Sequence, residues 1–210
     1  MRLTIDTFDD FVKFFFENGA EPFRRESDEE PELMYRPAQA AKFYEMLFTA
    51  ARDLPKRYDS RQIDAGFAAM IDCNVPMYVR DLIWNEHVEI EAREAMVSAM
   101  AVLFRDLFDR TPLFGTPFMW WDAITYDFEC GNRRRAESED VRRLQDRMFA
   151  TLVSILGLPS SESQRAALHG LGHLQHPDTT TAIEGYLASK PNLASDLRAY
   201  ARQSVAGLIP

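Results

Sequence analysis

The sequence predicts an all-α protein, built as an α-α superhelix or a compact array of helices, and three observations lead to this prediction. Apolar residues recur at the spacing of amphipathic helices along most of the chain. Residues that favour helix starts and stops bracket these stretches, while alternating runs typical of strands are short and isolated. With 46% hydrophobic residues, the 210-residue chain can bury a sizeable core. We therefore expect one domain over residues 1–210.

The first segment, residues 1–36, is expected to hold one helix and an acidic loop. Thr7 followed by Asp10 is a typical helix start, and the helix then places aromatic side chains on one face until Asn18-Gly19 ends it. The later stretch Glu26 to Glu32 combines five carboxylates with Pro31, which predicts a mobile loop that is dispensable for folding. An acidic recognition strip for a basic partner is the alternative.

The second segment, residues 37–157, is expected to contain the central helices. Pro37 suits the first turn of a helix, and Asp59 with Gln62 forms another capping pattern. We expect the longest helix over Val88 to Asp109, an aromatic helix over Phe118 to Phe128, and a capped helix between Ser138 and Gly157.

The third segment, residues 158–210, reads as three helices, Arg165 to Leu174, Thr179 to Ser189 and Leu193 to Gly207. The last contains Asp196-Leu197-Arg198, Ala201 and Gly207, and the first aligns with it at Ala166, Gly172 and Leu174. This segment, about a quarter of the chain, resembles HEAT-type repeats. The resemblance implies closely stacked helical hairpins, so we expect a neighbouring helix to approach Gly172. It implies no reaction.

Charge and composition narrow the classes of partner. The net charge of −9 disfavours nucleic acid and anionic membrane surfaces, and it permits a basic protein partner. No apolar run approaches the roughly 20 residues of a membrane span, and the amino terminus does not resemble a secretory signal, so we expect a cytoplasmic protein. Cys73 and Cys130 lack metal-binding spacing and are expected to be reduced thiols. The oligomeric state stays open.

Histidines form the first candidate site. His169 and His173 are four residues apart, which places both rings on one helix face in the arrangement that binds zinc or iron. His176 could supply a third ligand, and Glu184 on the next helix a carboxylate. The alternative is structural: one ring packs against a helix, one binds a carbonyl near the helix end, and one is solvated.

Carboxylates of the aromatic helix form the second candidate site. Asp122 lies beside two tryptophans, with Asp127 and Glu129 following, and an apolar pocket would raise the pKa of such a carboxyl enough for general acid catalysis. They could equally face solvent on a half-buried helix. Cys73 as a nucleophile would need a base such as His87, and the sequence gives no reason to bring the two together.

The aromatic side chains of the same helix form a candidate partner surface. Trp120, Trp121 and Tyr126 are residue types that anchor protein interfaces, and a bulky core helix is the alternative explanation.

Two functional hypotheses follow. The first is a non-catalytic protein-binding or scaffold module, with an antitoxin or immunity protein as one version. The alternative is a metal-dependent enzyme that uses His169 and His173. The sequence contains no glycine-rich phosphate loop, so no organic cofactor is expected. Metal analysis of the purified protein separates the two hypotheses, since metal-free protein of unchanged stability would favour the first.

Overall fold

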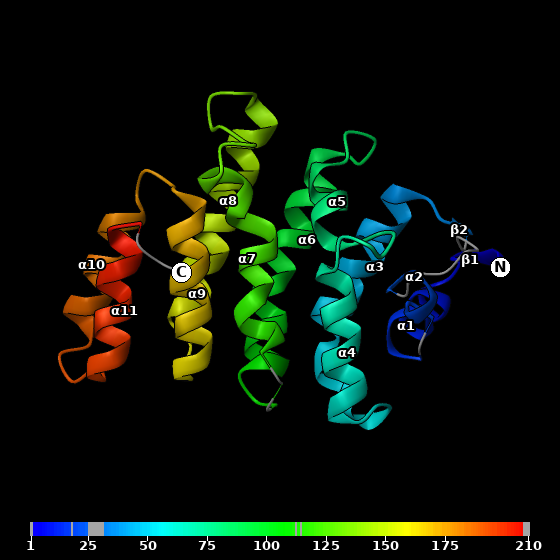
Figure 1. The fold of residues 1–210 in the computed structure, drawn as a ribbon, viewed down its shortest axis with the longest axis horizontal. Helices are drawn as coiled ribbons and strands as arrows, with labels where there is room; N and C mark the ends of the chain where they lie inside the picture. Colours follow the sequence, from blue (N-terminus) through cyan, green and yellow to red (C-terminus); the bar gives the residue numbers. More distant parts are fainter. Residues whose placement is uncertain (1, 18, 25–31, 112, 114, 208–210) are drawn as a thin grey trace. The chain divides into compact units, whose positions relative to one another are not determined.

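The computed structural model describes residues 2–17, 19–24, 32–111, 113 and 115–207. It confirms the all-α prediction: helices dominate the described residues, whose only strands are two three-residue segments (Figure 1). The contacts group the chain into two compact units. Unit 1 comprises Met1–Leu103 and Thr111–Thr116, and unit 2 comprises Phe104–Arg110 and Pro117–Pro210. The border between the two units falls inside residues 37–157, which the sequence predicted to be one stretch of central helices.

Unit 1 begins with two short strands around the first helices. Strand β1 (Arg2–Thr4) pairs in parallel with β2 (Glu32–Met34), with Leu3 opposite Leu33. Three residues are too few to show an alternating pattern, so the sequence did not reveal this pair. Glu32, expected to belong to the acidic loop, lies in β2. The remainder of that loop, residues 26–31, lies outside the described residues.

The first helices of unit 1 follow the predicted signals. Helix α1 (Phe8–Phe16) is capped by Thr7 and Asp10 in the reciprocal pattern that the sequence indicated. It buries Phe11 at 4.8 Å from the ring of Tyr44 in α3 (Pro37–Thr49). The short helix α2 (Glu21–Arg24) lies between α1 and β2.

The rest of unit 1 contains a 3₁₀ turn and three α-helices. These elements are the 3₁₀ turn Ala51–Lys56, α4 (Ser60–Ile71), α5 (Val79–Trp84) and α6 (Ile90–Leu103). The single helix predicted for Val88 to Asp109 is wrong at its end, because α6 passes into a π turn over Phe104–Phe108. The Asp109 amide donates to the Phe104 carbonyl at 2.8 Å, five residues back.

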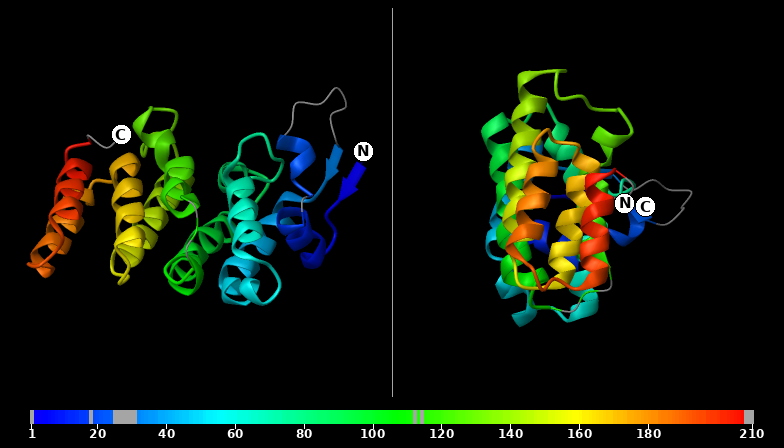
Figure 2. Two further views of the ribbon diagram at one scale, coloured as in Figure 1. Left: turned by 60° about the horizontal axis from the view of Figure 1, so that its bottom comes forward. Right: turned by 90° about the vertical axis from the view of Figure 1, so that its left-hand side faces the viewer.

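Unit 2 contains the π turn over Phe104–Phe108 and five α-helices, the first of which begins at Thr116, the last residue of unit 1. The α-helices are α7 (Thr116–Glu129), α8 (Glu139–Leu156), α9 (Ser161–Leu174), α10 (Thr179–Ser189) and α11 (Ser195–Val205). Helix α9 packs against α8 and α11, and α11 also packs against α10 (Figure 2). Within the described residues, every helix is too short or too polar to cross a bilayer.

Gly170 lies where α9 packs tightly against its neighbours in unit 2. A Cβ atom at this position would lie 2.6 Å from Trp121 Cβ of α7 and 2.8 Å from Leu152 Cδ2 of α8. A side chain there would overlap both neighbours, so α9 needs a glycine at this position. The sequence predicted a close helix approach at Gly172, which is two residues further along α9 and therefore nearly on its opposite face. That expectation stays a prediction.

Candidate metal centre

Helix α9 carries its histidines into the interior of unit 2. Ser160 caps the helix by accepting from the amides of Glu162 and Ser163, and the left-handed Gln175 (φ 50°) ends it. Between residues 163 and 174, every side chain except that of Arg165 is buried. A helix buried around its whole circumference leaves no solvated face for a histidine. The sequence alternative of a solvated ring therefore does not apply to His169 or His173.

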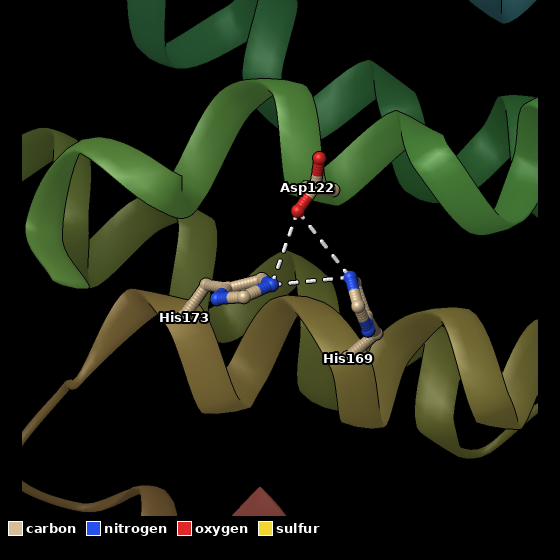
Figure 3. A group of neighbouring side chains, drawn as sticks. All are labelled: Asp122, His169 and His173. Carbon is tan, nitrogen blue, oxygen red and sulfur yellow. Dashed lines mark hydrogen bonds and ion pairs between the residues drawn. The ribbon is translucent and has the colours of Figure 1, made fainter. Parts of the chain in front are cut away.

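Three potential ligand atoms converge where α7 faces α9. His169 and His173 lie on one face of α9, as their spacing predicts, and Asp122 points toward them from α7 (Figure 3). The two Nε2 atoms are 3.1 Å apart. Oδ1 of Asp122 lies 3.4 Å from Nε2 of His169 and 3.1 Å from Nε2 of His173. The three atoms thus form a nearly equilateral triangle.

The size of this triangle fits a metal ion. An ion bound at about 2.1 Å holds two ligand atoms about 3.0 Å apart at right angles and about 3.4 Å apart in tetrahedral geometry. The observed separations of 3.1 and 3.4 Å fall in this interval. An ion equidistant from the three atoms would lie about 1 Å out of their plane.

The outer nitrogen of each imidazole has its own hydrogen-bond partner. Nδ1 of His173 is bonded to the carboxylate of Glu129, and Nδ1 of His169 lies 2.6 Å from the Tyr200 hydroxyl of α11. An ionised carboxylate only accepts, so Nδ1 of His173 carries the proton and its Nε2 presents a lone pair. The tyrosine hydroxyl can also accept, which leaves Nε2 of His169 free to act as a ligand. Two lone pairs and a carboxylate oxygen at this separation need a proton or a cation between them.

Burial sets the ionisation of the inner groups. Desolvation lowers the pKa of His169 below its usual 6.5, and the neighbouring His173 lowers it further, although the Asp122 carboxylate opposes both effects. Burial raises the pKa of Tyr200 to about 12, so this side chain remains a neutral hydroxyl at physiological pH. His169 is therefore uncharged near pH 7, the form in which imidazole binds metals.

One aromatic ring lies close to each histidine, and the carboxylate is the more exposed member of the triad. The Phe118 ring lies 4.4 Å from that of His169, and the Tyr126 ring 5.5 Å from that of His173. The imidazoles are almost completely buried, whereas the Asp122 side chain is 30% exposed. Asp122 is thus the solvent-exposed member of the triad.

Two of the predicted metal ligands lie elsewhere. Nε2 of His176 is 2.9 Å from Oδ1 of Asp146, and its Nδ1 accepts from the Asp178 amide, so both nitrogens stabilise the turn after α9. Glu184 is exposed on α10. The structure brings His169 and His173 together and leaves His176 and Glu184 outside this group, and metal binding by any of them stays a prediction. The third member is Asp122.

The predicted aromatic partner surface is wrong for both tryptophans. Trp120 and Trp121 have no exposed area, and Trp120 packs 5.8 Å from the ring of Phe108. Tyr126 is 52% exposed. The alternative explanation, a bulky core helix, therefore accounts for the tryptophans.

The remaining candidates do not join the triad. Cys73 and Cys130 are exposed free thiols. Asp127 is buried and accepts a hydrogen bond from the Asn132 side-chain amide at 3.2 Å, while Glu129 reaches His173. Sequence reasoning named Asp122 and Glu129 only as possible acids and did not mention Tyr200, because nothing local links them to histidines 31 to 47 residues away.

Comparison with known proteins gives no further guide to this site. No protein family matches the sequence, and no curated protein or solved structure is detectably similar to it.

Proposed function

We propose that unit 2 binds one divalent transition-metal ion through Asp122, His169 and His173. The observation that supports this proposal best is the convergence of three acceptor atoms within 3.4 Å, each from a different side chain. The outer nitrogens of both imidazoles are already engaged, which is the usual arrangement around histidines that ligate metals.

The donor set favours particular ions. Two imidazole nitrogens and one carboxylate oxygen suit Zn²⁺, Fe²⁺, Mn²⁺ or Co²⁺, whereas Ca²⁺ and Mg²⁺ prefer sites made of oxygen atoms. Three protein ligands leave at least one coordination position for water or another small ligand, as in catalytic rather than structural zinc sites. The proposal therefore favours the metal-dependent hypothesis over the scaffold hypothesis.

Metal analysis tests the proposal directly. The purified protein, stripped with a chelator and then dialysed against zinc, cobalt or manganese, should retain close to one ion per chain. Asp122→Ala, His169→Ala and His173→Ala should each lose most of it. His87→Ala is the matched control, because His87 is exposed in unit 1 and outside the triad, so it should bind as the parent does.

Two results would overturn the proposal. One is a folded parent protein that retains no ion, which would leave the triad as a hydrogen-bonded network around a shared proton. The other is an equal loss of metal in His87→Ala.

A further inference from the structure

We propose that Glu129 is a positioning residue that sets the metal affinity of the site by holding and polarising His173, with Tyr200 as its weaker counterpart at His169. This inference rests on the proposed metal site. It concerns residues that contact no metal themselves and act through the ligands.

Helix α7 holds both nitrogens of the His173 ring. Asp122 and Glu129 are seven residues apart, so they lie on the same face of α7 two turns from each other. Asp122 Oδ1 lies 3.1 Å from Nε2 of His173, and the Glu129 carboxylate forms a hydrogen bond with Nδ1 of the same ring. One helix thus supplies a ligand at one side of the ring and an acceptor at the other. The ring cannot rotate without breaking one of these contacts.

The Glu129 contact changes the ligand as well as its orientation. A carboxylate that accepts the Nδ1 proton pushes electron density toward Nε2, which makes that nitrogen a better metal donor. Together, Asp122 and Glu129 also bring two negative charges, which balance the charge of a divalent ion in a largely buried site. Glu129 is itself about a quarter exposed, at 26% of its side chain, so it is not part of the core.

Tyr200 has the same position relative to His169 but a different charge. Its hydroxyl lies 2.6 Å from Nδ1 of His169 and, as a phenol, is a neutral hydrogen-bond partner. Hydrogen bonds to a charged acceptor are roughly twice as strong as those between neutral groups. Loss of Glu129 should therefore weaken metal binding more than loss of the Tyr200 hydroxyl.

Cobalt binding to the full chain provides the test, since its visible absorption reports the ligand geometry. We expect Glu129→Gln, which keeps an acceptor but loses the charge, to weaken Co²⁺ binding about tenfold, and Glu129→Ala to weaken it up to about a hundredfold. Tyr200→Phe should have the smaller effect. All three variants should still bind one ion at saturation, with a shifted spectrum in Glu129→Ala. Glu184→Gln, an exposed carboxylate on α10, is the control and should match the parent.

The outcomes separate this inference from the proposal on which it rests. A parent protein that binds no cobalt contradicts the metal site itself. A parent that binds cobalt, with unchanged affinity and spectrum in Glu129→Gln and Glu129→Ala, contradicts only the role of Glu129. Complete loss of binding in Glu129→Ala, equal to that in Asp122→Ala, would make Glu129 a ligand and would also overturn the inference.

Discussion

Single residues in unit 2 acquire their chemistry from their neighbours. His169 is an ordinary helical histidine in sequence, yet desolvation lowers its pKa, and Tyr200 and Asp122 lie next to its two nitrogens. His176, three residues after His173, also has a buried ring but stabilises the turn after α9. Burial alone therefore does not distinguish a candidate ligand from a structural histidine. What distinguishes them is which groups the two ring nitrogens face.

The lowered pKa of His169 predicts how the metal-free protein responds to acid. The folded state resists protonation of this ring, so below pH 6.5 the unfolded state takes up a proton that the folded state does not. The contribution of His169 to the stability of the folded protein is complete above pH 6.5. It is lost as the pH falls toward the lowered pKa that His169 has in the folded state. The loss has a limiting slope of about 1.4 kcal/mol per pH unit for one proton. Urea unfolding between pH 8 and 5, with chelator present, measures it.

Substitution of the ring provides the control for this pH effect. His169→Gln should flatten the profile in this range, and His87→Gln should leave it unchanged. A parent protein that becomes more stable on acidification below pH 6.5 would contradict the argument.

At the scale of elements, unit 2 depends on close contact between α7 and α9. Gly170 permits this contact, because its missing side chain leaves room for Trp121, and the next residue along α7 is Asp122. The contact thus brings the carboxylate within reach of His169 and His173. The HEAT-like character of α9 to α11 stays a prediction.

A pair of glycines tests the contact. Gly170→Ala should destabilise the protein by about 1 to 3 kcal/mol, because the new methyl group would overlap Trp121 and Leu152. Gly185→Ala is the matched substitution inside α10, where a Cβ atom meets nothing within 4 Å, and it should stabilise by up to about 1 kcal/mol. Urea midpoints of the two variants provide the measurement. Stabilisation by both alanines would show that α7 and α9 do not approach closely at Gly170.

At the scale of the whole molecule, the proposed ion joins distant parts of the chain within one unit. Asp122 and His169 are 47 residues apart in sequence, and α8 lies between them along the chain. Because the unfolded chain has no preformed site, metal binding should stabilise the folded protein.

Unfolding with and without metal measures this coupling. Zinc at about one hundred times its dissociation constant should add about 2.7 kcal/mol to the free energy of unfolding. Asp122→Ala should show almost none of this gain, and Glu184→Ala all of it. Equal stabilisation of the parent and Asp122→Ala would place the ion at another site.

The sequence by itself determined the helical class, several helix ends and the pairing of His169 with His173. Capping residues, stop residues and the 3.6-residue period act over a few positions, so they can be read locally. Only the tertiary structure decided that Asp122 completes the triad, that Glu129 and Tyr200 hold its outer nitrogens, and that Trp120 and Trp121 are core residues. Those outcomes depend on which helix faces lie against each other, and that is settled by packing between residues far apart in the chain.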